Sequence, residues 1–248
     1  MTRPSVNFDL SPGDLSLPPA YRLKTAREVA DAFQTALASV SDGAGTLVWA
    51  RRFHIADFAV VLEPEQPLSE ARLAFYAAMS ALADALAVYC PPEKPILFDW
   101  PDAIKVDGAL VGGGRFAWPP GTQEHDTPAW LVFGAKVRVA TKPGEEPGNW
   151  TLGTSLEDEG FEDLSAAMLI ESFSRHLMSV LHDYEDAGPR REIERWLHRL
   201  DRKGLHGVLI TGEGDLVVRE GSTRNTRSLA AALAQPTWLD PKTNEPWL

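Results

Sequence analysis

Three successive glycines mark the part of this chain where a ligand can most easily approach the backbone. They are Gly112, Gly113 and Gly114, and strand-forming residues stand on both sides of them. Glycine has no Cβ, so its backbone N–H groups stay accessible to a bound molecule. We therefore predict that these residues bind a substrate or nucleotide. The alternative from the sequence is that a helix or a neighbouring strand packs closely against them.

A predicted β-hairpin precedes the glycines. Asp107-Gly108 lies between residues 104–106 and 109–111, and Asp-Gly between two apolar runs is the strongest short hairpin signal. A two-residue turn at this point pairs Lys105 with Leu110, and directly paired residues share one face of a sheet, with Cβ atoms about 5 Å apart. Lys105 is thus predicted to project to the same side as Leu110.

Four cationic side chains could serve an acid or phosphate group near this hairpin. Lys105 belongs to the hairpin, Arg115 follows the glycines, and Arg51 with Arg52 stands earlier in the chain. We predict that these four side chains surround one cleft floored by the glycines. The alternative is a set of solvent-facing side chains.

The sequence lacks the motifs of several other common enzyme classes. The sequence has no Gly-x-x-x-x-Gly-Lys-Ser/Thr loop, no His-Glu-x-x-His and no Gly-x-Ser-x-Gly. Its six histidines are scattered, and its single cysteine, Cys90, follows an apolar helix pattern, as a small buried hydrophobe does. We therefore expect no metal site.

The elements that must position these residues alternate between strands and helices. We predict helices at 25–40, from Ser69 into an apolar stripe, and at 165–183 and 189–200, from apolar residues at helical spacing. We predict strands at 46–51, 59–62, 96–98, 104–106, 109–111, 115–118, 130–139, 206–210, 215–220 and 223–228. This pattern indicates an α/β (α+β) fold with a mixed, mostly antiparallel sheet. Residues 1–203 would form the main domain, and residues 204–248 a small β-rich C-terminal domain and tail.

Composition narrows the class of protein. The 248 residues include 24 Lys plus Arg against 35 Asp plus Glu, a formal net charge of −11, which argues against nucleic-acid binding. No apolar run approaches the roughly 18 residues of a membrane span, and residues 1–10 do not look like a signal peptide. A single cysteine suits a reducing compartment. We therefore expect a cytoplasmic protein with no membrane partner.

At the hairpin the sequence resembles a known family. Residues 100–113, Trp-Pro-Asp-Ala-Ile-Lys-Val-Asp-Gly-Ala-Leu-Val-Gly-Gly, are similar to the Trp-Pro-Asn-Asp-Ile-x-Val-x-Gly-Lys-Lys-Ile-x-Gly hairpin of the biotin and lipoate protein ligase superfamily. The strand at 60–64 with the apolar helix after it, and the three short strands after Gly204, resemble the flanking parts of the family. The resemblance implies a ligase-like catalytic domain followed by a small SH3-like domain.

The resemblance also implies a chemistry. Family members join biotin or a lipoyl-type acid to ATP as an acyl-adenylate and then pass the acyl group to a lysine of a carrier domain. Here Trp100 and Asp102 fall in the ligand-binding hairpin, whereas Leu110 stands at the position of the catalytic lysine.

A charge that develops on an acyl phosphate needs a cation, and losing one donor costs about 10²–10³ in rate. The resemblance therefore implies Lys105, on the same face as Leu110, as the catalytic cation, with Arg51, Arg52 and Arg115 as ligand-binding residues. The Gly/Arg-rich adenylate loop, expected between Thr46 and Ala59, lacks its glycines. If the activity is retained, ATP and Mg are the implied cofactors.

Three functions follow from these observations. The first is ATP-dependent adenylation of a biotin- or lipoate-type acid and its transfer to a carrier lysine, with catalysis weakened or lost because Leu110 supplies no cation. The second is a non-catalytic module that binds a carboxylate ligand, a nucleotide or a carrier domain in the same cleft. The third is an ATP-independent octanoyl-type acyltransferase, which needs a nucleophilic cysteine, and Cys90 is the only thiol.

Overall fold

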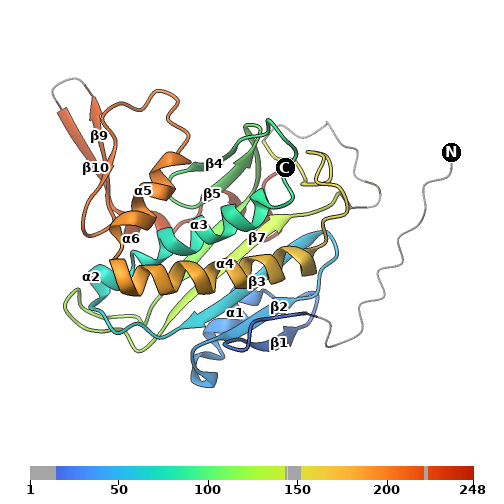
Figure 1. The fold of residues 1–248 in the computed structure, drawn as a ribbon, viewed down its shortest axis with the longest axis horizontal. Coiled ribbons are helices and arrows are strands. Elements are labelled where there is room, and N and C mark those ends of the chain that lie inside the picture. Colours follow the sequence, from blue (N-terminus) through green and yellow to red (C-terminus); the bar gives the residue numbers. More distant parts are fainter. Residues whose placement is uncertain (1–14, 143, 145–151, 221–222) are drawn as a thin grey trace.

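The computed structural model describes residues 15–142, 144, 152–220 and 223–248. A sheet of seven strands lies at the centre of these residues (Figure 1). Its order is β1 (Arg22–Ala26), β2 (Thr46–Ala50), β3 (Ile55–Leu62), β7 (Leu131–Arg138), β6 (Ala109–Ala117), β5 (Ala103–Val106) and β4 (Ile96–Asp99). Only the β1–β2 pair of this sheet is parallel. The predicted mixed, mostly antiparallel sheet is therefore confirmed.

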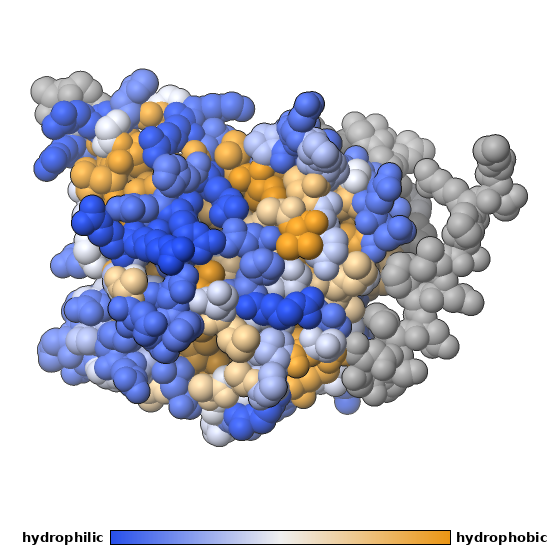
Figure 2. Space-filling view, viewed as in Figure 1, coloured by the Kyte–Doolittle hydropathy of each residue, from blue (hydrophilic) through white to orange (hydrophobic). Residues whose placement is uncertain are grey.

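Helices cover one face of the sheet, which we call the helix face. They are α2 (Leu68–Ala71), α3 (Ala74–Ala87), α4 (Ala166–Ala187) and α5 (Arg190–His198), and α3 and α4 run across the strands in Figure 1. Phe133, Ala135 and Val137 of β7 alternate along the strand and join the core beneath these helices. In Figure 2 the outer side of the helix layer is mostly hydrophilic, as expected for amphipathic surface helices.

The opposite face of the sheet carries the other set of alternating side chains, and we call it the site face. Part of it is covered by α1 (Ala32–Leu37), which packs against Ala59 and Val132. Gly134 of β7 permits this contact, because a Cβ there would lie 2.6 Å from the Phe33 ring. The rest of the site face carries the charged residues considered below.

One predicted helix, at 25–40, differs from the structure. Residues Arg22–Ala26 form β1 instead, paired with β2 from Arg22↔Thr46 to Ala26↔Ala50. The helix starts only after Asp31, whose carboxylate accepts from the Gln34 N–H at 2.8 Å. A short 3₁₀ turn, η1 (Val40–Asp42), follows it. Phe33, Ala36 and Leu37, whose spacing predicted the helix, do lie in α1. The predicted start was too early, because Thr25 and Ala26 pair with β2 and this pairing overrides local helix preference.

The remaining strands and helices lie near their predicted positions. The hairpin turns at Asp107 and Gly108, both with positive φ (52° and 89°), and β6 then runs unbroken through the glycines. The helices predicted at 165–183 and 189–200 appear as α4 and α5. Among the described residues, none of the helices combines the length and the apolar character that crossing a membrane requires.

The C-terminal part begins with a separate sheet. Its strands are β8 (Leu209–Ile210), β9 (Leu216–Glu220) and β10 (Thr223–Arg227), all antiparallel, and they stand apart at one end of the molecule (Figure 1). After α6 (Leu229–Leu233), the chain returns to the large sheet as β11 (Leu239–Asp240) and β12 (Glu245–Pro246). There β12 contacts β6 and β7. The predicted domain boundary at residue 204 stays a prediction.

Candidate functional site

Two cations lie buried on the site face of β7. Lys136 and Arg138 alternate with the core residues of that strand, and each is 1% exposed. The Lys136 amine donates to Asp31 Oδ2 and to the Asn244 carbonyl, both at 2.8 Å, and lies 3.6 Å from Asp57 Oδ2. A buried amine needs such partners, because an unpaired charge away from water costs several kcal/mol.

The two carboxylates beside Lys136 differ in their pKa values. Burial alone would raise the pKa of Asp31, but the Lys136 ammonium, the Gln34 N–H and Arg115 outweigh burial and lower it to about 2. Burial dominates at Asp57 and raises its pKa to about 6, although Lys136 and Arg52 offset part of the effect. One lysine therefore stabilises the charge of Asp31 more than that of Asp57.

A second cluster surrounds the carboxylate of Glu245, which belongs to β12. Its Oε1 lies 3.2 Å from His54 Nε2 and 3.4 Å from Arg52 Nη1. Its Oε2 accepts from Lys142 Nζ at 2.7 Å and lies 3.6 Å from Arg138 Nη2. Burial would raise the pKa of Glu245, but His54 and Lys142 outweigh burial and lower it to about 2. The cluster thus holds a carboxylate in its charged form.

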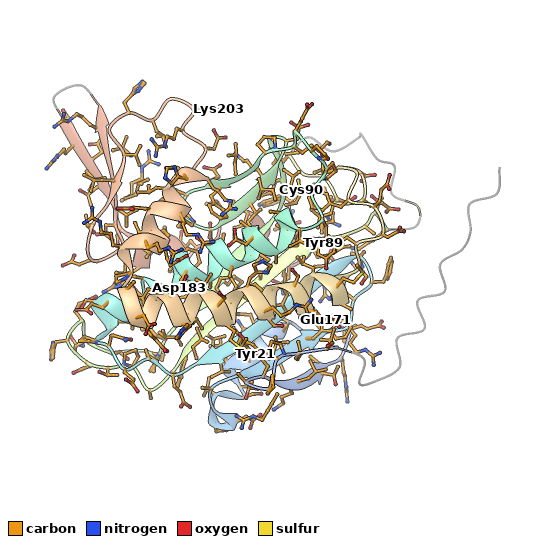
Figure 3. The ribbon with its side chains drawn as sticks, in the orientation of Figure 1. Tyr21, Tyr89, Cys90, Glu171, Asp183 and Lys203 are labelled. Carbon is orange, nitrogen blue, oxygen red and sulfur yellow. The ribbon has the colours of Figure 1, made fainter. Side chains whose placement is uncertain are left out.

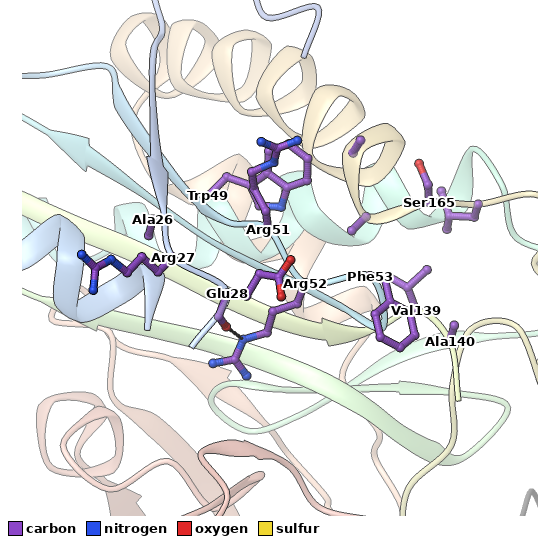
Figure 4. A pocket seen from close by; sticks show the side chains of 13 residues that line it. Ala26, Arg27, Glu28, Trp49, Arg51, Arg52, Phe53, Val139, Ala140 and Ser165 are labelled. Atoms are coloured by element: carbon purple, nitrogen blue, oxygen red, sulfur yellow. Dashed lines mark hydrogen bonds between the residues drawn. The ribbon is translucent and has the colours of Figure 1, made fainter. Parts of the chain in front are cut away.

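A cavity of about 540 Å³ opens beside this cluster (Figure 4). Its walls combine cationic, apolar and helix-terminal residues: Ala26, Arg27, Glu28, Trp49, Arg51, Arg52, Phe53, Val139, Ala140, Leu164, Ser165, Ala166 and Ala167. Ser165 caps the N-terminus of α4, and its hydroxyl accepts from the Met168 N–H at 3.2 Å. Few polar groups among apolar walls are typical of a small-molecule site.

The predicted arginines lie in two different surroundings. Arg52 borders the cavity and donates to the Glu28 carbonyl at 2.7 Å (Figure 4). Arg51 also borders the cavity, with its guanidinium 5.7 Å from the centre of the Trp49 ring. Arg115 donates to Asp31 at 3.1 Å on the site face. The structure therefore brings Arg51 and Arg52 to one cavity and places Arg115 in the neighbouring network around Lys136.

Lys105 does not join the arginines. The predicted pairing with Leu110 is present, so both residues share the site face. The amine, however, donates to Asp99 at 2.9 Å and lies 3.9 Å from Asp201, on the side of the edge strand β4. The expected convergence of four cations on one cleft is therefore corrected, because two carboxylates hold Lys105 at the sheet edge.

Close packing accounts for the three glycines. A Cβ at Gly112 would lie 2.0 Å from the Lys136 carbonyl oxygen, and one at Gly114 would lie 2.5 Å from Met79 Sδ. A Cβ at Gly113 would lie 2.5 Å from the Trp238 ring. These contacts support the packing alternative, and the ligand-binding role of the glycines stays a prediction. Gly113 forms the floor of a recess on the site face, and the Trp238 indole fills that recess.

Trp100 and Asp102 hold the hairpin in place. The Trp100 indole donates to the Tyr76 hydroxyl of α3 at 3.2 Å and packs against the core. Asp102 is 1% exposed, and burial raises the pKa of its carboxyl to about 7. Neither residue lines the cavity. Their predicted binding roles stay predictions.

Four residues of the site carry no motif in the sequence. Lys136 and Arg138 fall in the predicted strand at 130–139, and Asn244 and Glu245 fall in the predicted C-terminal tail. A signal existed in the strand itself, because two cations two residues apart in an otherwise apolar run share one buried face. Nothing local indicates that Glu245 reaches them, since it lies over 100 residues away in the chain.

The residues present do not fit ATP with its magnesium. Leu110, at the position of the family's lysine, lies in an apolar cluster with Ala103 and Trp238. The segment between Thr46 and Ala59, where the family's adenylate loop would lie, carries no glycine. Neither feature supplies the cation that the phosphates of ATP require.

Comparisons with known proteins agree with this architecture. Residues 17–198 match the model of the biotin/lipoate A/B protein ligase family. No protein with curated annotation matches the chain. Among solved structures, a biotin protein ligase-like protein of unknown function from Silicibacter sp. TM1040 has 24% identity and a TM-score of 0.77, over 89% of this chain and all of that one.

Two similar structures contain ligands. The Aquifex aeolicus biotin protein ligase in complex with biotin and ATP has 12% identity and a TM-score of 0.57, over 83% of this chain and 95% of that one. The Leishmania major biotin protein ligase in complex with biotin has 16% identity and a TM-score of 0.54, over 85% and 99%. These likenesses concern the fold. Because the family model spans most of the sequence, the chain belongs to the biotin/lipoate A/B protein ligase family.

Proposed function

We propose that this protein binds a carboxylic acid of the biotin or lipoate type without activating it. The observation that carries this proposal is the cavity at the end of β2, where Arg52 stands beside apolar walls formed by Trp49 and Val139. A guanidinium binds the carboxylate of such an acid, and apolar walls take up its chain or ring. Two related ligases were solved with biotin, which supports this choice of ligand class.

The absence of an activating step rests on the hairpin. An acyl phosphate needs a cation where its charge develops. Leu110 is 8% exposed and packs against Trp238, while the amine of Lys105 is held by Asp99 at 2.9 Å. Leu110 therefore supplies no cation at the position of the family's lysine, and Lys105 is engaged by a carboxylate instead. Without adenylation there is also no transfer to a carrier-domain lysine, because that reaction uses the activated acyl group as its substrate.

The position of Cys90 argues against an octanoyl-type acyltransferase activity. Cys90 lies just beyond the end of α3, next to Tyr89 (Figure 3), and does not line the cavity. Burial raises the pKa of this thiol, although Lys94 offsets part of the effect, so less of the reactive thiolate is present at neutral pH. Its Sγ contacts the Lys94 carbonyl at 3.3 Å.

Calorimetry with biotin, lipoate and octanoate, together with pyrophosphate detection in the presence of ATP and Mg, tests this proposal. We expect at least one acid to bind and to stabilise the fold by about 2.7 kcal/mol at a hundredfold excess over Kd, with no pyrophosphate released. An Ala140→Phe variant, which fills the cavity, should abolish binding. Ala187→Phe, at the exposed end of α4, is the matched control and should bind normally.

Two results would contradict the proposal. Pyrophosphate release with any of the acids would establish a working ligase. Binding that survives Ala140→Phe unchanged would place the acid outside the cavity.

A further inference from the structure

The C-terminal segment 236–248, which we call the tail, lies on the site face, whereas the cavity opens at the N-terminus of α4, and Arg52 contributes to both places. Its anchor is Trp238, which is 1% exposed and packs on Ala103 and Leu110. The ring also fills the recess above Gly113, where a Cβ would lie 2.5 Å from it. The tail thus covers the part of the hairpin at which the sequence predicted a ligand.

Three successive tail residues beyond this anchor face buried cations. The Asn244 carbonyl accepts from Lys136 at 2.8 Å, and the Pro246 carbonyl accepts from Arg138 at 3.0 Å. Between them, Glu245 places its carboxylate among Arg52, His54, Arg138 and Lys142. One carboxylate and two carbonyl oxygens of the chain itself therefore occupy donors that would suit an anionic ligand.

Arg52 connects the tail to the cavity. Its side chain lines the cavity wall and also lies 3.4 Å from Glu245 Oε1. An acid whose carboxylate reached Arg52 from the cavity would meet the Glu245 carboxylate at the same guanidinium. Two carboxylates at one guanidinium repel each other, so each weakens the binding of the other there.

The end of the tail is attached by side chains rather than by a strand ladder. β11 and β12 pair only with each other, through Leu239↔Pro246 and Asp240↔Glu245, in a two-stranded sheet of their own. Its release would break no pairing of the seven-stranded sheet. An isolated two-stranded hairpin is marginally stable at best, so the bound position depends on side-chain contacts. They are those with the cations, the bond from the Asn244 amide to Asp31, and the packing of Trp247 on the Trp238 cluster.

We propose that the tail beyond Trp238 is a displaceable occupant of the acid site, and that a carboxylic acid entering the cavity competes with the Glu245 carboxylate. This inference rests on the proposed function. Trp238 stays in place as the anchor, while residues 243–247 leave the cations when the acid binds. The protein would then take up its ligand by exchanging an internal carboxylate for an external one.

The first test measures lipoate affinity in a Glu245→Gln variant. The amide keeps the shape of the side chain and removes its charge, so the cations no longer hold an internal carboxylate. We expect lipoate to bind about tenfold more tightly than to the wild type. Glu194→Gln, in an exposed pair with Arg190 on α5, is the matched control and should leave the affinity unchanged. An affinity in Glu245→Gln equal to or weaker than that of the wild type would overturn the proposal.

The second test follows amide hydrogen exchange of residues 243–247. Saturating lipoate should make these amides exchange at least several-fold faster in the wild type, while β7 keeps its protection. In buffer without any acid, Glu245→Gln should already show faster exchange than Glu194→Gln. Tail exchange that lipoate leaves unchanged or slows would contradict displacement.

These measurements separate this inference from the proposed function. If no acid binds to the wild type or to either variant, the proposed function fails and competition with an acid fails with it. Faster exchange in Glu245→Gln would then still establish Glu245 as the contact that holds the tail. If an acid binds and tail exchange is the same in all three proteins, the proposed function stands and the displaceable tail is wrong.

Discussion

At the residue scale, burial changes the acid–base behaviour of single carboxyls on the site face. Asp102 and Asp57 have raised pKa values, about 7 and 6, because both are desolvated. Asp31 and Glu245 have lowered values, about 2 for each, because neighbouring cations outweigh burial. The difference lies in what each carboxylate contacts rather than in its depth alone.

Asp102 gives the clearest prediction at this scale. Its pKa is raised from 3.8 to about 7, so the folded state holds the proton more tightly than the unfolded chain does. The resulting stability is present below pH 4 and is lost as the pH rises through 7. Asp102→Asn, which cannot ionise, should therefore exceed the wild type in unfolding free energy at pH 8 by about 1–3 kcal/mol.

Thermal melts of both proteins from pH 4 to pH 8 check this prediction. The gap between them should widen steadily with pH. Because Asp57 is common to both proteins, its own titration cancels to first order. A constant gap at every pH would show that Asp102 does not titrate in the folded protein over this range.

At the element scale, the site depends on the register of β5, β6 and β7. Gly113 pairs with Ala103 on one side and with Lys136 on the other, so the glycine, the hairpin and the buried lysine lie in one row across the sheet. A shift by one residue would turn Lys136 into the apolar core, which explains why the register is strictly specified.

The helix that borders the cavity supplies a second prediction. Ser165 caps α4, and its loss leaves an N–H group of the first turn without that acceptor. Ser165→Ala should lower the unfolding free energy by about 1 kcal/mol. Ser165→Asp keeps an acceptor at the cap and should stay close to the wild type. Urea denaturation measures both, and equal losses in the two variants would argue against a capping role.

At the scale of the whole molecule, the tail connects charged residues that come from distant parts of the chain. Glu245 contacts His54 and Arg52 from the β2–β3 connection, Arg138 from β7, and Lys142 just beyond it. The tail therefore holds together parts of the sheet that are remote in sequence, and its docking is expected to depend on pH.

The sign of that dependence follows from the Glu245 pKa, which is lowered from 4.5 to about 2. The ion pairs contribute stability above pH 4.5 and lose it as the pH falls toward 2. At pH 7 the wild type should exceed Glu245→Gln in unfolding free energy by about 1–3 kcal/mol. Denaturation at a series of pH values should show this advantage shrinking below pH 4.5. An advantage that persists at pH 2–3 would mean that the carboxylate charge is not its source.

Much of the scaffold could be predicted from the sequence because it depends on local chemistry. Asp107-Gly108 indicates its hairpin through the positive φ angles that these residues tolerate, and the alternating run at 130–139 indicates β7. The helix predicted at 25–40 is shorter in the structure, since a strand partner distant in sequence makes residues 22–26 a strand. Local periodicity carries no information about such a partner.

The sequence by itself determined the hairpin, most of the strands and helices between residues 46 and 200, and the resemblance to the ligase family, since each depends on residues close together in the chain. Only the tertiary structure decided which charges meet. It turned Lys105 toward Asp99, brought Lys136 to Asp31, and placed Glu245 among cations that no spacing connects to it. The physical reason is that a charge taken out of water must find a partner in space, and the fold alone determines which partner is within reach.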